Sequence, residues 1–301
     1  MKAAKLSIVI PIFDNAGSLE LLVKRVLDSV EMIDEIIMVD DGSMDNSWFI
    51  IKELSKKYAG IVKGIKFAKN YSQAIATIAG ITNTNSDVII CISADLQDPP
   101  ELIQQLVKEH DLNSVDIVIA HREKREEGIF TKLMSYIAYY FARLECPQIP
   151  RGGYDFFLIS NRVREILINS KNRNRFPQSE ILNTGLPFLA IPYTRNKREI
   201  GTSGYTLTKK FRVFIDIILS ETATINKIFT KIYIFTNLIG LLFYVFLKIL
   251  NFKIDILEYG IIYLTLLVNL KIVNQIVSSV VISRIYEEQK GRPLYVIQER
   301  C

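Results

Sequence analysis

EIIMVDDGS, at residues 35–43, joins an apolar run that ends in an acid to a loop of Asp, Gly and Ser. Short β-branched runs favour buried strands, and Asp, Gly and Ser are typical of the tight turns that follow them. Four other short apolar runs occur in the N-terminal part of the chain: LSIVI (6–10), IVKGIKF (61–67), DVIICI (87–92) and DIVIA (116–120). We therefore predict five strands in this part of the chain.

The segments between these runs have the pattern of helices. Residues 18–30, the segment that ends at Tyr58 and the small-residue stretch 73–81 each lie between two predicted strands. Strands that alternate with helices form a mostly parallel sheet with helices on both faces. Near-continuous apolar strands fit burial on both faces. The predicted fold class is therefore α/β, a Rossmann-like and mostly parallel sheet.

Polar side chains follow the predicted strands. They are Asp14, Asn15, Asp40, Asp41, Asn70, Asp95, Gln97 and Asp98. Because ligands of such sheets bind beyond the carboxyl ends of the strands, we predict that this cluster marks the site. The sequence contains neither the GxGxxG loop of dinucleotide-binding proteins nor the P-loop with its Lys.

Carboxylate and amide oxygens of this kind suit a divalent ion. Mg²⁺ or Mn²⁺ bridges protein carboxylates and substrate phosphates, and neutralises charge on a departing nucleoside diphosphate. Asp95 and Gln97, two residues apart in one loop, are the predicted metal ligands. The structural alternative is that these residues form ordinary turns and helix caps. That alternative is strongest for Asp98, which precedes a Pro-Pro-Glu sequence.

The last third of the chain is much more apolar. Residues 232–250 form a run close to the ~20 residues that span a bilayer core. A further run, at about 257–282, carries polar residues such as Glu258, Asn269 and Lys271. We interpret it as another span, with an interfacial or buried soluble helix as the alternative. The prediction is a C-terminal two-helix transmembrane hairpin with both ends on the cytoplasmic side.

Three parts are therefore predicted. They are a catalytic domain at 1–225, transmembrane helices at 226–283 and a C-terminal tail at 284–301, with the domain and tail on the cytoplasmic face of the inner membrane. Segments 130–144 and 207–219 have apolar faces near Lys and Arg, and either lie flat in the interface or pack on the sheet. Polar residues in the run at 257–282 also suit helix–helix contact, which leaves a homo-oligomer open.

The charge balance gives little support to a nucleic-acid partner. The chain has 37 Lys and Arg against 32 Asp and Glu, a formal net charge of +5, with no dense basic tract interleaved with aromatics. A modest positive balance suits a protein held near anionic lipid. Cys91, Cys146 and Cys301 lack the spacing of a zinc site or a disulfide framework.

Two sets of segments carry a family resemblance. One set resembles, in order and spacing, the family 2 glycosyltransferases of the GT-A fold: VIPIFDN (9–15), VDDGSMDNS (39–47), FAKNYSQ (67–73) and ADLQDPPELI (94–103). The other set resembles the polyprenyl-phosphate branch of that family: HREKREEG (121–128), DFFLISNRV (155–163), REIGTSGYTL (198–207) and RIYEEQKGRPLYVI (284–297). That branch contains dolichol-phosphate mannose synthases and bacterial undecaprenyl-phosphate glucosyl- and aminoarabinosyl-transferases. The segment at 284–297 particularly resembles the bacterial GtrB type.

The resemblance implies roles for the matching residues. It places the nucleotide-sugar on Pro11, Phe13, Asn15, Asp40, Asp41, Asn70, Ala94, Asp95 and Arg122. It places the lipid phosphate on Arg198, Ser203, Tyr205 and Lys209. Catalysis is expected of Asp95, Arg122, Asp155 and Arg198. A guanidinium suits a phosphate partner because it donates two parallel hydrogen bonds.

The sequence departs from the family pattern at three places. Ser93 stands at the first position of the usual Asp-x-Asp, which leaves Asp95 as the only acid of that pair. Lys69 and Ser72 replace the commoner Arg and Gly around Asn70. Gly204 stands where a Lys often precedes the Tyr, so one phosphate contact is expected to move to Lys209 or Lys210.

The function that the resemblance implies is inverting sugar transfer from a nucleotide-sugar, UDP-glucose favoured, to undecaprenyl or another polyprenyl phosphate. The product would serve cell-envelope glycan synthesis or modification. Three alternatives stay open: a GDP-mannose-using enzyme of the dolichol type, a membrane polysaccharide synthase, and a non-catalytic membrane scaffold. A synthase generally needs more spans and a QxxRW-like motif, yet Trp48 is the only Trp.

Overall fold

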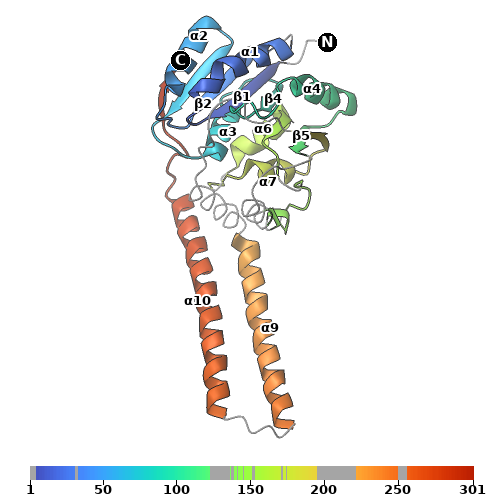
Figure 1. The fold of residues 1–301 in the computed structure, drawn as a ribbon, viewed down its shortest axis with the longest axis vertical. Helices are drawn as coiled ribbons and strands as arrows, with labels where there is room; N and C mark the ends of the chain where they lie inside the picture. Colours follow the sequence, from blue (N-terminus) through green and yellow to red (C-terminus); the bar gives the residue numbers. More distant parts are fainter. Residues whose placement is uncertain are drawn as a thin grey trace. The chain divides into compact units, whose positions relative to one another are not determined.

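A computed structural model describes residues 5–30, 33–122, 136, 139–140, 142–144, 146–150, 153–170, 172–173, 175–194, 222–249 and 256–301. The chain divides into two compact units (Figure 1). The first comprises Met1–Phe214 with Pro293–Cys301, and the second comprises Ile215–Arg292. The last nine residues of the chain therefore belong with the N-terminal unit.

Among the described residues, eight strands form one sheet in the first unit, in the order β7-β5-β6-β4-β1-β2-β3-β8. The strands are β1 (Leu6–Ile12), β2 (Glu35–Asp40), β3 (Val62–Phe67), β4 (Val88–Cys91), β5 (Ile117–Arg122), β6 (Phe156–Ser160), β7 (Phe188–Tyr193) and β8 (Ile297–Arg300). Strands β4, β1, β2 and β3 run parallel, as do β5 and β7, whereas β6 and β8 are antiparallel to their neighbours. The mostly parallel sheet agrees with the predicted fold class.

Helices cover both faces of this sheet. They are η1 (Ala16–Ser18), α1 (Leu19–Ser29), α2 (Ser47–Lys57), α3 (Gln73–Thr82), α4 (Leu102–Asn113), α6 (Asn161–Asn169) and α7 (Pro177–Leu182). Alternate residues of β2 point to opposite faces of the sheet. Ile36 and Met38 belong to the hydrophobic core that α1, α2 and α4 share. Ile37 and Val39 belong to the core on the α3 side. Such two-sided burial requires the continuous apolar strands seen in the sequence.

All five predicted strands are present, and the predicted helices correspond to α1, α2 and α3. Three further strands, β6, β7 and β8, have no counterpart in the prediction. Strand β8 returns to the free edge of β3, where the backbone N–H of Gly64 donates to the carbonyl of Cys301 at 2.8 Å. The side chain of Glu299 also accepts a hydrogen bond of 2.7 Å from the Trp48 indole.

The second unit contains two long helices, α9 (Thr222–Ile249) and α10 (Ile256–Gln289). They contact one another where the Tyr263 hydroxyl donates to Asn237 at 3.2 Å. A Cβ on Gly240 would lie 2.2 Å from the Tyr263 ring, so this helix contact requires glycine. In the described part of the chain, one window, Tyr263–Val280, is long and apolar enough to cross a membrane.

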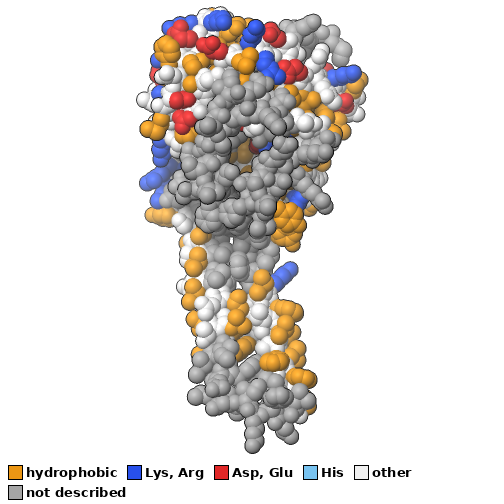
Figure 2. Space-filling view, viewed as in Figure 1, with side chains coloured by type: hydrophobic (Ala, Val, Ile, Leu, Met, Phe, Trp, Pro, Cys, Tyr) orange, Lys and Arg blue, Asp and Glu red, His pale blue; other side chains and the backbone are white. Residues whose placement is uncertain are grey.

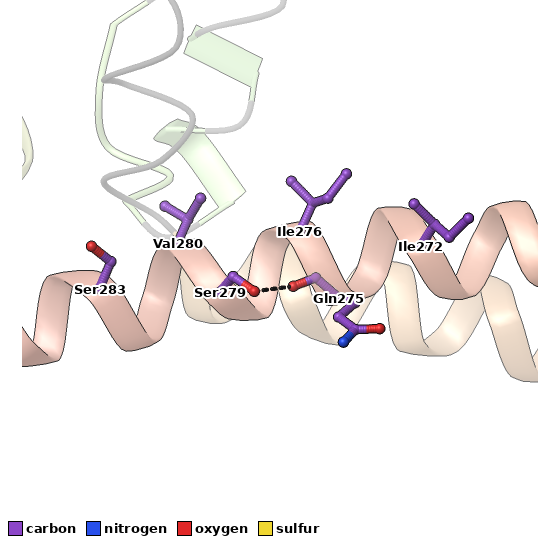
Figure 3. A pocket seen from close by; sticks show the side chains of 6 residues that line it. All are labelled: Ile272, Gln275, Ile276, Ser279, Val280 and Ser283. Atoms are coloured by element: carbon purple, nitrogen blue, oxygen red, sulfur yellow. Dashed lines mark hydrogen bonds between the residues drawn. The ribbon is translucent and has the colours of Figure 1, made fainter.

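Apolar side chains dominate the exposed surface of these helices, whereas charges of both signs are scattered over the described surface of the first unit (Figure 2). A hollow of about 430 Å³ follows one face of α10 (Figure 3). Its lining has two rows of four-residue spacing: Ile272, Ile276 and Val280, and Gln275, Ser279 and Ser283. The Ser279 hydroxyl is not available to a ligand as a free donor, since it bonds the Gln275 carbonyl at 2.9 Å.

Candidate active site

The polar residues that follow β1, β2, β3 and β4 meet at one edge of the sheet, because these four strands are parallel and adjacent. Pro11 is paired with Val39 near the end of β1, and Phe13 follows that strand. Asp40 ends β2. The sequence-predicted cluster is therefore assembled in space at the carboxyl edge, where ligands of such sheets bind.

The loop after β1 is locked to the loop after β2. Asp14 Oδ1 accepts the Met44 N–H at 2.8 Å, and the Asn15 N–H donates to Ser47 Oγ at 3.1 Å. The Ala16 N–H donates to Asp45 Oδ2 at 3.0 Å. Asn15 also donates its side-chain amide to the Phe13 carbonyl at 2.7 Å. These bonds hold two of the predicted nucleotide-binding loops in a fixed relation.

Asp41 connects the loop after β2 to the loop after β3 by hydrogen bonds. Its two carboxylate oxygens accept the backbone N–H groups of Tyr71 at 2.6 Å and Ser72 at 3.0 Å. Its carbonyl accepts the Asn70 side-chain amide at 3.3 Å. Gly42 permits this approach, because a Cβ there would lie 2.7 Å from the Lys69 carbonyl carbon. Asp41 is thus a structural anchor in this arrangement as well as a predicted ligand residue.

Two adjacent buried carboxylates, Asp40 and Asp41, lie at this edge of the sheet, and the charge of Asp40 affects the pKa of Asp41. Burial and, to a smaller extent, the charge of Asp40 raise the pKa of Asp41 to about 6, against the hydrogen bonds from Tyr71 and Ser72 that lower it. Burial also raises the pKa of Asp40, whose Oδ1 accepts the Ser43 N–H at 2.9 Å. Asp40 Oδ2 is buried with no hydrogen-bond partner among the described residues. The pair favours cationic or hydrogen-bond-donating groups of a ligand.

The loop after β4 carries the predicted metal ligands. Ala94 is tied to the loop after β1, since its carbonyl accepts the buried Ser18 hydroxyl at 2.6 Å. Asp95 Oδ1 accepts the Gln97 N–H at 3.2 Å, across Leu96, which has a left-handed φ of 59°. This tight turn brings the two predicted metal ligands to one loop tip.

The side chains of Asp95 and Gln97 offer few oxygen ligands, so a hard cation bound there would take most of its ligands from other groups. Within the described ranges, no group of three or more His, Cys, Asp and Glu side chains could hold a metal ion. One carboxylate and one amide oxygen from the Asp95–Gln97 turn are the kind of oxygen ligands that Mg²⁺ accepts together with substrate phosphates and water. A metal held here would take its remaining ligands from outside these two side chains.

A buried polar network lies beside this loop. The guanidinium of Arg122, at the end of β5, donates to Asp155 Oδ2 at 2.7 Å and to the Tyr193 hydroxyl at 3.4 Å. Tyr193 donates in turn to Asp98 Oδ1, and Gln178 donates its amide to Asp155 Oδ1 at 3.0 Å. Residues from β5, β7 and the starts of β6 and α7 thus converge behind the β4 loop.

Neighbouring charges explain why the buried Arg122 stays protonated. Burial disfavours the guanidinium, but the charges of Asp155 and Asp98 outweigh it and raise the pKa of Arg122 above its usual value. Burial and the charge of Asp98 also raise the pKa of the Tyr193 phenol, so Tyr193 acts as a donor at neutral pH. The Arg122 side chain is only 8% exposed, whereas Asp155 is 35% exposed. Arg122 is therefore bonded to other protein side chains, and Asp155 is the more exposed residue of this ion pair.

Asp98 is not the N-cap of α4, contrary to the structural alternative. The N-cap of α4 is Glu101, and Asp98 is fully buried with its Oδ1 bonded to Tyr193. Gln178 and Tyr193 were absent from the predicted site. No local pattern marks them, because their partners Asp155 and Asp98 lie 23 and 95 positions away in the sequence.

Four predicted residues, Arg198, Ser203, Tyr205 and Lys209, lie outside the described residues. The predicted interfacial segment at 207–219 also lies outside them, as does most of the segment at 130–144. Their assignment to a lipid phosphate or an interface therefore stays a prediction.

Comparison with known proteins gives a family match over the N-terminal part of the chain and relatives that cover nearly all of it. Residues 7–214 match the family described as Glycosyl transferase family 2. An uncharacterized glycosyltransferase of Synechocystis sp. is 29% identical, covering 98% of this chain and 95% of that protein. The undecaprenyl-phosphate 4-deoxy-4-formamido-L-arabinose transferase of Photorhabdus laumondii is also 29% identical, covering 98% of this chain and 94% of that protein. The crystal structure of glucosyl-3-phosphoglycerate synthase from Mycobacterium tuberculosis with Mn²⁺ and UDP-glucose has a TM-score of 0.50 at 15% identity, covering 73% of this chain and 79% of that one.

Proposed function

Because the chain belongs to glycosyl transferase family 2, we propose that it transfers a sugar from a nucleotide-sugar donor to a polyprenyl phosphate, with UDP-glucose as the favoured donor. The observation that carries the proposal is the meeting of the Asp41 anchor and the Asp95–Gln97 turn at one sheet edge. A relative of nearly equal length is named as a transferase that acts on undecaprenyl phosphate, which supports the lipid acceptor.

The nucleoside end of the donor is assigned to the loops after β1, β2 and β3. Asp41 and Asp40 supply carboxylate oxygens there, and these accept hydrogen bonds from ribose hydroxyls or base N–H groups. Asn15 and Asn70 line the same loops. The fixed hydrogen bonds between these loops preorganise them, which reduces the entropy lost on binding.

The diphosphate is assigned to the turn after β4. Asp95 and Gln97 would hold Mg²⁺ or Mn²⁺ together with the diphosphate, and such an ion stabilises the charge on the departing nucleoside diphosphate. A solved structure of the same fold contains Mn²⁺ and UDP-glucose, which supports this assignment. Arg122, which bonds Asp155, is linked to the same loop through Tyr193 and Asp98.

The reaction requires little acid–base catalysis by the protein. A lipid phosphate is already anionic at neutral pH, so one of its oxygens attacks the anomeric carbon without prior deprotonation. The carbon–oxygen bond to the nucleoside diphosphate breaks as the new bond forms on the opposite face, which inverts the anomeric configuration. Orientation and charge stabilisation at the site supply most of the rate.

The second unit is assigned to the bilayer. The exposed apolar side chains of α9 and α10, such as Phe235 and Leu264, fit contact with lipid tails, and the window Tyr263–Val280 is long enough to span. We assign both helices as spans, with the first unit on the cytoplasmic side of the inner membrane and self-association through polar residues of α10. The catalytic domain at 1–225, the spans within 226–283 and the tail at 284–301 remain the proposed division.

The test is transfer of radiolabel from separate nucleotide sugars into undecaprenyl phosphate by the purified full-length protein in detergent, with Mg²⁺ or Mn²⁺. We expect one donor to label the organic-soluble lipid, and we expect Asp95→Ala to abolish the labelling. Asp111→Ala, on the exposed part of α4, is the matched control and keeps activity. Absence of transfer from every donor would overturn the proposal.

A further inference from the structure

Gln178 lies in the first turn of α7 and is 8% exposed. Its Nε2 donates to Asp155 Oδ1 at 3.0 Å. A carboxylate oxygen only accepts hydrogen bonds, so this contact fixes which branch of the amide faces Asp155. The carbonyl oxygen Oε1 must then occupy the other branch.

That oxygen is buried and has no hydrogen-bond partner among the described residues. Two donor groups of this network bond other acceptors. The Tyr154 hydroxyl donates to the Gln178 backbone carbonyl at 2.7 Å, and Arg122 donates to Asp155 and Tyr193. Buried polar atoms in folded proteins are generally paired, so an unpaired acceptor in a polar network needs an explanation. A hydrogen-bond donor of a bound ligand would provide one.

Gln178 is linked to the loop of the proposed diphosphate site through Asp155 and Arg122. Asp155 immediately precedes β6, in which Phe157 pairs with Cys91 just before the Asp95 turn. On the other side of the network, Arg122 contacts Tyr193, whose hydroxyl donates to Asp98 in the same loop as Asp95. Under the proposed function the sugar is attached to the diphosphate, so it is the part of the donor that we assign to the side of this network.

We propose that Gln178 is a specificity-determining residue whose Oε1 accepts a hydrogen bond from one hydroxyl group of the donor sugar. The inference rests on the proposed transfer reaction. A sugar hydroxyl is a neutral donor of the kind that an unpaired amide oxygen accepts, and the bond to Asp155 holds that oxygen in place. A site built to bond a hydroxyl discriminates against an analogue that lacks it, because the acceptor is then left unpaired.

The experiment uses the full-length protein and a series of monodeoxy analogues of the nucleotide sugar that it transfers. The wild type should lose roughly tenfold to hundredfold in kcat/KM with one analogue, since an unpaired buried acceptor has a cost of that order. Gln178→Met keeps the side-chain length but removes both polar atoms. It should lower kcat/KM for the parent sugar by a similar factor and show no further loss with that analogue.

Two more variants separate this role from a purely structural one. Gln178→Glu keeps an acceptor oxygen and should retain the discrimination, although it weakens the contact to Asp155. Asn183→Ala, which removes an exposed amide at the end of the same helix, should behave as the wild type. UDP binding, measured by calorimetry, should be unchanged in all variants and reports that they are folded.

The outcomes distinguish the inference from the proposed function. If the wild type transfers no sugar, the proposed function fails. If the wild type transfers sugar but Gln178→Met retains the full discrimination, or lowers kcat/KM equally for every analogue, the inference is wrong while the function stands. If Gln178→Met does not fold, equal activity of the wild type towards all monodeoxy donors overturns the inference by itself.

Discussion

The carboxylate of Asp41 accepts the backbone N–H of Ser72 at 3.0 Å, and Ser72 has a φ of 115° and a ψ of 154°. This region of backbone conformation is occupied almost only by glycine, and a side chain there costs about 1–3 kcal/mol. Ser72 directly precedes α3, and the neighbouring N–H of Tyr71 bonds the same carboxylate. Asp41 therefore holds a strained loop beside the proposed nucleotide site.

Replacing Ser72 by Gly should relieve this strain. We expect the free energy of unfolding to rise by about 1 kcal/mol, because part of the gain is offset by the greater flexibility of unfolded glycine. In a domain of about 150–250 residues this corresponds to a rise in Tm of about 2–4 °C. Ser72→Ala keeps the strain and is the control. Equal Tm values for the Gly and Ala variants would contradict the interpretation.

The raised pKa of Asp41 predicts a pH dependence of stability. The folded-state pKa of about 6 lies above the ordinary value of 3.8, so the contribution of Asp41 is fully present below about 3.8 and is lost as the pH rises through about 6. A rise of this size corresponds to roughly 3 kcal/mol. The Tm of Asp41→Asn relative to the wild type should therefore increase between about pH 4.5 and about pH 7.5.

Asp45→Asn is the control for this measurement. Although burial opposes it, hydrogen bonds from Ser47 and the Ala16 N–H lower the pKa of Asp45, so its contribution is present above the ordinary value and is lost only in acid. The Asp45 variant should show little change over the same pH range. A pH dependence of Asp41→Asn no greater than that of Asp45→Asn would rule out the predicted titration.

The Tyr193–Asp98 hydrogen bond should contribute strongly to stability. Tyr193→Phe removes this hydrogen bond from the buried Asp98, and the loss of a buried hydrogen bond of this kind costs about 1–3 kcal/mol. We expect a lower Tm and weaker binding of UDP, because Asp98 lies in the loop of the proposed metal ligands. Tyr58→Phe, at the end of α2, is the matched control and should change neither quantity. An unchanged Tm for Tyr193→Phe would show that the network contributes no net stability.

The sheet was predictable where local sequence determines it. The strand of Ile36 to Val39 is apolar on both faces and ends in Asp40, and this pattern needs no knowledge of distant residues. Strand β8 shows the opposite case. Its sequence, IQER, is polar and mostly exposed, so it forms a strand only because the edge of β3 offers backbone partners.

The same distinction holds for the site. Asp41 and Asp95 were predictable as a cluster because each follows a recognisable strand, and parallel neighbours end at the same edge. The pairing of Arg122 with Asp155 was not, because it depends on how β5 and the antiparallel β6 meet. Gln178 illustrates the limit most clearly: its chemistry depends on one fixed amide orientation that no sequence pattern encodes.

Removal of the C-terminal strand provides a final prediction with an intrinsic probe. Trp48 is the only tryptophan of the chain, is 6% exposed and donates its indole N–H to Glu299 at 2.7 Å. Deleting residues 297–301 removes this partner and opens the backbone edge of β3, which promotes aggregation. We expect a red shift of the tryptophan emission and a lower Tm.

Glu299→Gln distinguishes the contribution of the Glu299 side chain from that of the whole strand β8. The glutamine keeps an acceptor oxygen for Trp48 and removes only the ion pair with Lys52, which is exposed and contributes about 0–1 kcal/mol. Its emission and Tm should stay close to those of the wild type, whereas the truncated protein should change in both. Unchanged emission after truncation would mean that β8 does not cover Trp48 in solution, and the sheet would then end at β3.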